Sequence, residues 1–189
     1  MRYAQEHKAE TREKILGAAA RLFTEFGYDG VGVDAIMAEV GLTAGGFYSH
    51  FSSKQSLFAE SLATAIDAGK SLRMQKDSHP DSLRTMINSY LSRSHRDQVA
   101  EGCPLPALTS DVARSNAETR ESYEQQLLIF LRELEAVLAG ATTSRRETAL
   151  ALMAQCVGGL MLARAVNDEQ LSDRILKACR RAALKLGEE

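Results

Sequence analysis

The chain has 189 residues, of which 44% are hydrophobic and 25% are charged, and its formal net charge is −2. This composition is typical of a folded globular protein and excludes an intrinsically disordered chain. The near-neutral charge provides no bulk attraction to nucleic acid, so a DNA-binding role has to depend on where individual charges lie.

The N-terminal sequence MRYAQEHKAETREK is polar and carries both signs of charge. It therefore has neither the apolar core of a secretory signal nor the composition of a transit peptide, and we expect a cytoplasmic protein. The three cysteines, Cys103, Cys156 and Cys179, lie far apart and show no CxxC spacing. This spacing argues against a disulfide framework or a structural zinc, so we expect no metal and no cofactor.

Residues 11 to 27 predict an amphipathic helix that Thr11 can cap at its start. The apolar residues that recur at spacings of four, three and four are Ile15, Ala19, Leu22 and Phe26. Gly27 suits a left-handed helix end. A short second helix is expected over residues 33 to 40, and it stops at Gly41.

The next stretch, LTAGGFYSHF, predicts a third helix capped by Thr43. Gly45 and Gly46 lower its helix propensity by about 1 kcal/mol each relative to alanine. Two short helices joined by a tight turn at Gly41 predict a helix-turn-helix, whose second helix lies in the major groove of DNA. The two glycines then leave room for the DNA backbone, although the same pattern is compatible with a plain helical corner.

Side chains around this third helix suit contacts to phosphate. Tyr48 and His50 can both donate to phosphate oxygens, whereas Phe47 and Phe51 can face inward and anchor the helix. Lys54 adds a positive charge in the first turn of the following helix, beside free backbone amides. A histidine at a helix end can also have a purely structural role, so His50 alone does not identify a binding site.

The remainder of the chain predicts six more helices and no alternating β pattern. They are expected over residues 52 to 75, 82 to 94, 105 to 114, 117 to 139, 145 to 166 and 170 to 186. The breaks fall at His79-Pro80-Asp81 and around Gly102-Cys103-Pro104. The fold class is therefore all-α with nine helices, divided into residues 1 to 56 and residues 57 to 189.

The apolar run ALALMAQCVGGLMLARAV is interrupted by Gln155 and Arg164, and it is too short and too rich in small residues for a membrane span. A helix that is apolar nearly all round needs a second chain to cover it. We expect a homodimer with a four-helix bundle of two such helices per chain, and no membrane partner. The expected interface residues are Leu152, Cys156, Gly158, Gly159, Met161, Leu171, Ile175, Ala178 and Ala182.

The stretch TREKILGAAARLFTEFGYDGVGVDAIMAEVGLTAGGFYSHFSSKQSLF resembles the DNA-binding region of the tetracycline-repressor (TetR) family of transcriptional regulators. The run VGGLMLARAVNDEQLSDRIL is similar to the dimerisation helices of that family. The resemblance implies that Tyr48, His50 and Lys54 hold phosphates. It also implies that a recognition helix faces base edges through Thr43, Ala44, Gly45, Gly46, Phe47 and Tyr48. Ala44 stands where many members carry Lys or Arg, so it provides no long side chain to read a base.

The resemblance also implies that residues 81 to 139 enclose a chamber for a small-molecule effector. The candidate lining residues are Met86, Tyr90, His95, Cys103, Leu108 and Tyr123. All except Cys103 are equally compatible with an ordinary core. Cys103 directly precedes Pro104, so it can sit at a helix N-cap with a lowered thiol pKa and react with electrophiles, or it can simply fill space beneath a loop.

The sequence thus predicts a DNA-binding repressor that binds a palindromic operator as a homodimer and is released by a small-molecule or thiol-reactive effector. Two alternatives remain. A thiol enzyme could use Cys103 with His95, but no third group to orient the histidine is evident, and the G-x-S-x-G, phosphate-loop and HExxH motifs are absent. An architectural DNA-binding protein would bind without regulating transcription. We expect no enzymatic activity.

Overall fold

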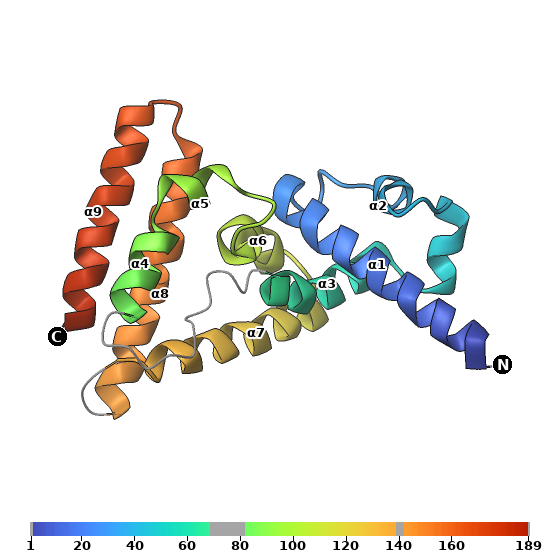
Figure 1. The fold of residues 1–189 in the computed structure, drawn as a ribbon, viewed down its shortest axis with the longest axis horizontal. Helices are drawn as coiled ribbons and strands as arrows, with labels where there is room; N and C mark the ends of the chain where they lie inside the picture. The colour runs from blue at the N-terminus through green and yellow to red at the C-terminus, as the bar shows by residue number, and fades with distance from the viewer. Residues whose placement is uncertain (1, 69–81, 139–141, 189) are drawn as a thin grey trace.

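The computed structural model describes residues 2–68, 82–138 and 142–188, and the secondary structure of this part of the chain consists of helices joined by turns, with no strand (Figure 1). It contains nine α-helices and one 3-10 helix, so the all-α fold class is confirmed. The elements are α1 (Arg2–Phe26), α2 (Val33–Glu39), η1 (Ala44–Ser49), α3 (Lys54–Ala68), α4 (Ser82–Tyr90), α5 (Arg93–Asp97), α6 (Pro104–Ala113), α7 (Ala117–Glu135), α8 (Thr142–Ala165) and α9 (Glu169–Glu188). The break expected at residues 79 to 81 lies outside the described residues.

Ten helical elements replace the nine expected because the helix predicted over residues 82 to 94 is two helices. The Ser92 side chain accepts a hydrogen bond from the backbone N–H of His95 at 3.1 Å and so caps a new helix, α5. Serine at such a position satisfies an N–H that has no partner within its own helix. The chain therefore turns after Tyr90.

Helix α1 begins at Arg2, well before the start predicted at Thr11. The Thr11 hydroxyl donates to the carbonyl of His7 at 2.8 Å, a bond within the helix, so it does not cap the helix start. The additional turns place His7 and Lys8 alongside the helix-turn-helix. The predicted end is confirmed, because Gly27 has a φ of 76° and its N–H donates to the carbonyl of Phe23.

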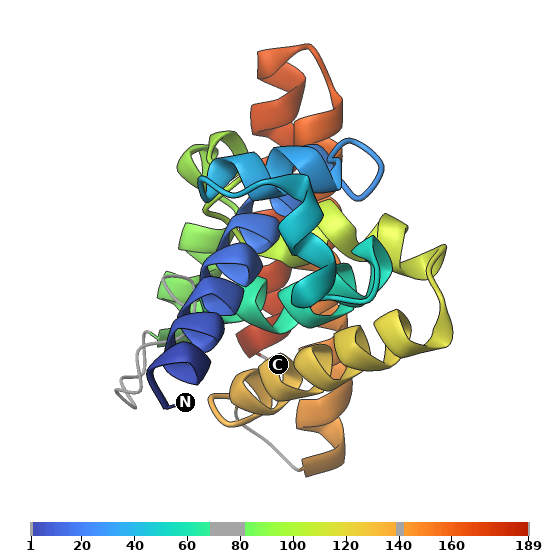
Figure 2. The same cartoon turned by 90° about the vertical axis from the view of Figure 1, so that its right-hand side faces the viewer.

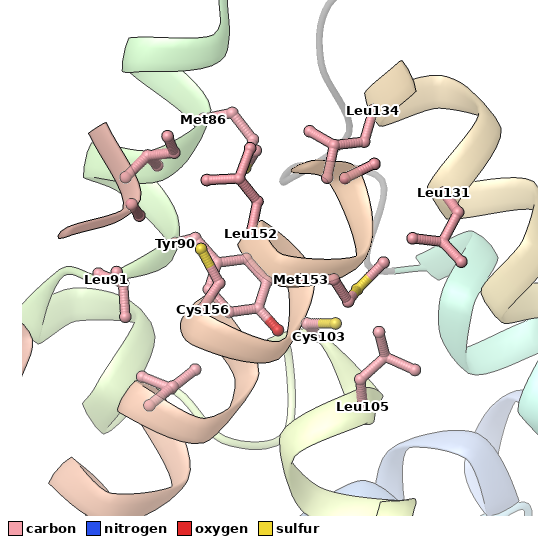
Figure 3. Close-up of a cluster of buried hydrophobic side chains, with 14 of the residues drawn as sticks. Met86, Tyr90, Leu91, Cys103, Leu105, Leu131, Leu134, Leu152, Met153 and Cys156 are labelled. Carbon is pink, nitrogen blue, oxygen red and sulfur yellow. The ribbon is translucent and has the colours of Figure 1, made fainter. Parts of the chain in front are cut away.

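Buried apolar side chains form two clusters. The N-terminal cluster joins α1, α2, η1 and α3, and its largest members include Phe23, Phe47 and Phe58. The C-terminal cluster joins α4, α6, α7, α8 and α9 (Figure 3). Each fully buried phenylalanine or leucine stabilises the fold by about 1.5–3 kcal/mol relative to an exposed one.

Helices α6 and α7 lie between the two clusters and connect them (Figure 1). The Asp111 carboxylate on α6 accepts a hydrogen bond from the backbone N–H of Tyr28 at 3.0 Å. The Ser122 hydroxyl on α7 donates to the carbonyl of Ala59 on α3 at 2.7 Å. Figure 2 views the molecule from the helix-turn-helix end, with α8 and α9 behind. Through these contacts α6 and α7 fix the segments that precede and follow the helix-turn-helix.

Candidate functional site

The helix-turn-helix consists of α2, a turn at Gly41 and η1. Gly41 has a φ of 71°, a conformation that glycine adopts without steric cost. Its N–H donates to the carbonyl of Ala38 at 3.0 Å, and the N–H of Leu42 donates to the carbonyl of Met37 at 2.9 Å. These bonds close the turn tightly and place η1 across the end of α2.

The expected recognition helix is a 3-10 helix, and its cap differs from the prediction. Thr43 occupies the N-cap position, but its side chain makes no capping hydrogen bond. Its backbone carbonyl instead accepts from the N–H of Gly46 at 3.0 Å. The Thr43 hydroxyl is therefore exposed and available to a partner.

Phe47 was expected among the residues that face DNA, and the structure corrects this. Its side chain is 0% exposed, because it lies in the N-terminal cluster with its ring stacked on Phe51 at a centroid distance of 5.8 Å. Phe47 thus supports η1 from beneath and cannot reach a nucleic acid. The adjacent Tyr48 is 73% exposed, with its ring edge-on to Phe47 at 5.2 Å.

Gly45 and Gly46 lie on η1 where no internal constraint requires glycine. A Cβ at Gly45 would meet no atom of the chain within 4 Å, and at Gly46 it would make only an ordinary contact with Met37 at 3.7 Å. Neither residue has a positive φ. Neither the backbone conformation nor packing within the described residues requires glycine at these two positions.

His50 and Lys54 lie at the far end of η1 and at the start of α3. The Nδ1 atom of His50 is buried and has no hydrogen-bond partner in the described part of the chain. Burial lowers the pKa of His50, and the charges of Lys8 and Arg12 lower it further. Lys54 holds its Nζ 4.2 Å from the ring centroid of Tyr28, a cation–π contact that fixes where its charge lies.

Sequence analysis did not place any α1 residue in this region. His7, Lys8 and Thr11 of α1 line a groove of about 410 Å³ together with residues of the helix-turn-helix, including Thr43 and His50. The periodic apolar pattern that locates a helix begins only at Ile15. The polar first turns gave no such signal, which is why these residues were missed.

Three of the predicted effector residues, Met86, Tyr90 and Cys103, lie together in the C-terminal cluster (Figure 3). Tyr90 is fully buried, and its hydroxyl points toward Cys103 but has no hydrogen-bond partner of ordinary geometry. Burial raises the pKa of Tyr90 well above its usual range. An unpaired buried hydroxyl costs about 1–3 kcal/mol, so its retention requires a reason.

Cys103 is the N-cap residue of α6, directly before Pro104, as predicted. The expected lowered thiol pKa is wrong, however. Burial raises the pKa of the Cys103 thiol, and the neighbouring Tyr90 hydroxyl and the backbone of Leu105 offset this only in part. Burial likewise raises the pKa of Cys156 to about 12. Both thiols are therefore poor nucleophiles at neutral pH.

His95 is a structural clamp instead of a lining residue. Its Nδ1 is 2.8 Å from the carbonyl of Tyr90, and its Nε2 accepts from the backbone N–H of Cys103 at 3.0 Å. A Cβ at Gly102 would approach the ring within 2.9 Å, so glycine is required there. Because both ring nitrogens are occupied, His95 cannot serve as a base for Cys103, which removes the geometry that a thiol enzyme needs.

Leu108 and Tyr123 lie elsewhere than expected. Leu108 belongs to the N-terminal cluster, so it is separated from the other candidate effector residues. Tyr123 packs against both clusters, and its hydroxyl lies 2.7 Å from the hydroxyl of Thr109. Tyr123 thus lies beside the cluster that holds Met86, Tyr90 and Cys103, whereas Leu108 does not.

Arg164 is a half-buried cation that the sequence indicated only as an interruption of an apolar run. Its Nε and Nη2 donate to the carbonyls of Arg96 and His95 at 3.0 and 2.6 Å, and its Nη1 is buried without a partner. Burial lowers the pKa of Arg164, and its charge acts on both Tyr90 and Cys103. Among the described residues, Tyr90 Oη and Arg164 Nη1 are thus two buried donors without a hydrogen-bond partner.

Apolar side chains are exposed along α8 and α9, which form one end of the molecule (Figure 1). Leu162 and Leu150 on α8 are 59% and 48% exposed, and Leu171 on α9 is 38% exposed. Met161 and Ile175 are half-buried, while Ala178 and Ala182 are exposed. A Cβ at Gly158 would meet no atom of the chain within 4 Å. Six of the predicted interface residues are thus available to a second chain, namely Gly158, Met161, Leu171, Ile175, Ala178 and Ala182, whereas Leu150 and Leu162 were not predicted.

Three other predicted interface residues are not available. Leu152 and Cys156 are buried within their own chain. Gly159 packs against α9, because a Cβ there would lie 2.8 Å from the side chain of Cys179. Predicting the interface from a helix that is apolar all round could not separate the face that packs on α9 from the face that remains open.

One helical segment in the described residues, Ser144–Ala165, is long and apolar enough to cross a membrane by length and composition, and 39% of its most apolar stretch is buried within the chain. A helix that is shared between a core and a subunit interface has the same composition. The half-buried Arg164 near its end donates to carbonyls of α5, which fits packing inside a protein better than contact with lipid.

Comparison with known proteins places these features in a family. Residues 15–61 match the bacterial regulatory proteins of the tetR family, and residues 80–179 match the tetracyclin repressor-like C-terminal domain. The chain is 27% identical over 137 residues to the HTH-type transcriptional regulator YfiR of Bacillus subtilis, a match that spans 71% of this chain and 66% of YfiR.

Two further relatives extend the comparison. The chain is 38% identical over 56 residues to IcaR, the HTH-type negative transcriptional regulator of the biofilm operon icaADBC in Staphylococcus aureus, which covers 30% of each chain. The crystal structure of a TetR transcriptional regulator from Chloroflexus aurantiacus has a TM-score of 0.76 at 22% identity, over 95% of both chains. The structural likeness supports the fold alone, whereas the two family matches together span most of the chain.

Proposed function

The chain belongs to the tetracycline-repressor family of DNA-binding transcriptional regulators, and from this premise we propose that it is a homodimeric repressor released from a palindromic operator by a small molecule. Residues 1 to 56 would bind DNA, and residues 57 to 189 would bind the effector and the second chain. Such a regulator acts where the chromosome lies, so the proposal includes a cytoplasmic location and no membrane partner.

The observation that carries the DNA-binding proposal is the exposed surface of η1. Tyr48 projects from it almost fully exposed, and Gly45 leaves an open space beside it. A phenol donates to phosphate oxygens, while missing side chains let backbone approach backbone closely. Thr43, Ala44, Gly46, His50 and Lys54 complete the surface, and Phe47 supports it from within.

The open apolar residues on α8 and α9 support the homodimer. A single soluble chain rarely leaves several leucines of adjacent helices exposed without a partner. A two-fold dimer would bury Leu150, Leu162 and Leu171 with the same residues of its partner. The two copies of η1 would then be related by that axis, which explains why the operator should be a palindrome.

Two buried donors that have no hydrogen-bond partner among the described residues support a reversible effector. Tyr90 Oη and Arg164 Nη1 both lack an acceptor, and Met86 and Met153 nearby have flexible side chains that can adapt to a ligand. The effector would therefore be largely apolar with a carbonyl or carboxylate oxygen. A thiol-reactive effector is less consistent with the raised pKa of Cys103.

Repression, as opposed to activation, is supported by IcaR, a negative regulator whose similarity to this chain covers the length of a DNA-binding region. A repressor needs only to occupy its operator, so no further surface for RNA polymerase is required.

The raised pKa of the Cys103 thiol and the occupied ring nitrogens of His95 favour regulation over thiol catalysis.

A selection experiment tests the proposal. The purified protein is incubated with fragments of its genome, and the retained duplexes are sequenced. We expect a pseudo-palindrome whose half-site centres lie about one helical turn, or a multiple of it, apart. The selected site should lie in a promoter and bind at least a hundredfold more tightly than a scrambled duplex. Equal binding to both duplexes would instead favour an architectural protein.

A further inference from the structure

The groove between the first turns of α1 and the helix-turn-helix has a polar lining of unusual charge. We call it the α1–η1 groove, and its volume is about 410 Å³. Its polar side chains are His7, Lys8, Thr11, Thr43, Ser49 and His50. These groups are cationic, can become cationic, or are hydroxyls, and no carboxylate is among the described residues that line the groove. Such a lining favours an anion.

The carboxylates of α1 point away from this groove. Glu6, Glu10 and Glu13 lie at least about 100° around the helix from the centre of the face that carries His7, Lys8 and Thr11, at 100° per residue. The first turns of α1 therefore have a net charge close to zero, but their basic and acidic side chains lie on different faces, and the basic face is turned toward η1. The net charge of this region alone does not show this separation.

The cationic groups in the groove lack an anion. Arg12, one turn further on, is paired with Glu60 and lies over the ring of Phe51. Lys8 has no carboxylate partner in the described part of the chain, and the buried Nδ1 of His50 has no hydrogen-bond partner. The charge of Lys8 reaches His50 strongly enough to lower the pKa of that imidazole. An acceptor placed between Lys8 and His50 would satisfy both.

We propose that the α1–η1 groove binds a backbone phosphate of operator DNA, with Lys8 as its principal cation and Thr11 and His50 as hydrogen-bond donors. This inference rests on the proposed DNA-binding function and extends its interface from η1 to the first turns of α1. DNA is the occupant because the groove is continuous with η1: Thr43, Ser49 and His50 line it, while Tyr48 projects from the same helix.

A phosphate held there would have two effects. It would fix the register of η1 along the duplex, since phosphate contacts position a protein without reading sequence. It would also make the start of α1 part of the binding surface, although this segment lies beyond the helix-turn-helix itself.

The test compares the variants Lys8→Ala and Lys8→Arg with Lys177→Ala. Lys177 is exposed on α9, so its replacement makes the same charge change far from the groove. Binding of the full chain to the selected duplex and to a scrambled duplex is measured by fluorescence anisotropy over a series of salt concentrations. Circular dichroism confirms that each variant keeps its helical content.

For Lys8→Ala we expect the slope of log K against log salt to become shallower by roughly 2, about one unit for each protomer's lysine. The affinity for the two duplexes should fall by the same factor. Lys8→Arg should keep the wild-type slope because it retains the charge, and Lys177→Ala should match the wild type.

Two results would overturn the inference: a Lys8→Ala slope equal to that of Lys177→Ala, or a loss of affinity confined to the selected duplex. The wild-type protein separates this failure from failure of the proposed function. If it does not distinguish the selected from the scrambled duplex, the regulator proposal itself fails. If the wild type does distinguish the two duplexes and Lys8→Ala behaves as Lys177→Ala does, only the phosphate site at Lys8 is rejected and the regulator proposal stands.

Discussion

Gly45 has an exposed position on η1 where the chain itself places no atom near a Cβ. Glycine weakens a helix relative to alanine by about 1 kcal/mol, so a glycine without an internal role is a cost to the free chain. The same absence of a side chain lets the backbone of η1 approach another backbone closely. We therefore predict that Gly45 serves binding rather than folding.

Replacing Gly45 with leucine should separate these two effects. We expect Gly45→Leu to unfold at the wild-type temperature or slightly above it, because the new side chain meets nothing in the chain. Its affinity for the selected duplex should fall at least tenfold, because the side chain occupies the space that DNA needs. Thermal melts and anisotropy titrations measure both quantities.

Gly17→Leu is the matched control for this change. Gly17 is exposed on α1, away from η1, and a Cβ there also meets no atom of the chain within 4 Å. It should leave DNA affinity unchanged. If Gly45→Leu binds the duplex as tightly as Gly17→Leu does, η1 does not approach DNA at that point.

Tyr90 and Tyr123 form a natural pair for testing the effector site. The Tyr90 hydroxyl is buried and unpaired, whereas that of Tyr123 bonds to Thr109 at 2.7 Å. We expect Tyr90→Phe to raise the free energy of unfolding by about 1 kcal/mol, since it removes an unsatisfied donor, and Tyr123→Phe to lower it by about as much. Urea denaturation gives both values.

The sign of the Tyr90→Phe change is decisive. A protein usually keeps a destabilising polar group only where function needs it. Should Tyr90→Phe destabilise the protein as Tyr123→Phe does, its hydroxyl must already have a partner in solution. The proposal that it waits for an effector oxygen would then lose its basis.

At the scale of whole elements, α4, α5 and α6 are held together by one imidazole. His95, in the middle of α5, bonds to the carbonyl of Tyr90 on α4 and to the N–H of Cys103 at the start of α6. The second bond uses the lone pair of Nε2, so it exists only while the ring is neutral. Protonation would break the link to α6.

This clamp predicts how stability depends on pH. Burial lowers the pKa of His95 in the folded protein, the bond to Tyr90 opposes this in part, and Arg164 lowers the pKa further. The unfolded chain therefore binds a proton first, at about pH 6.5. The neutral His95 therefore contributes to the free energy of unfolding above about pH 6.5, and this contribution is lost as the pH falls toward the pKa of His95 in the folded protein.

Urea unfolding between pH 5 and pH 8 measures the effect. We expect the free energy of unfolding to fall on acidification, and this slope to be reduced in His95→Gln, which cannot titrate. His50→Gln serves as a comparison, because burial lowers the pKa of His50 as well. A His95→Gln variant with the full wild-type slope would show that His95 does not control the acid sensitivity.

The elements also show what sequence periodicity can predict. Repeating apolar positions located most helices, and Gly27 and Gly41 marked two helix ends, because only a positive φ suits those turns. Apolar periodicity did not predict helix boundaries that depend on local polar residues. It could not show that Ser92 caps α5, or that α1 begins at Arg2.

The residues of the candidate sites likewise divide into those that the sequence pattern predicted and those that it did not. Tyr48 and Gly45 were identified because their residue types are unusual on a helix. Arg164 and the clamp at His95 were not, because their roles depend on carbonyls of other elements. A side chain's partners across the fold, such as Leu108 in the N-terminal cluster, are set by packing that a single sequence does not display.

For the molecule as a whole, Gly158 and Gly159 provide an internal contrast. Adjacent on α8, they face different surroundings: Gly159 packs against Cys179 of its own chain, whereas nothing lies near Gly158. If α8 and α9 form a two-fold interface, Gly158 is open only in the isolated protomer. A charge there would be tolerated by one chain and buried without a partner in the dimer.

We therefore expect Gly158→Glu to give a helical monomer that no longer binds the operator, since an unpaired buried carboxylate costs several kcal/mol. Gly159→Ala should instead destabilise the protomer, because its Cβ would lie 2.8 Å from Cys179. Sedimentation at micromolar concentration distinguishes monomer from dimer, and anisotropy reports DNA binding. A Gly158→Glu protein that sediments as a dimer would place the interface elsewhere, and with it the axis that relates the two recognition helices.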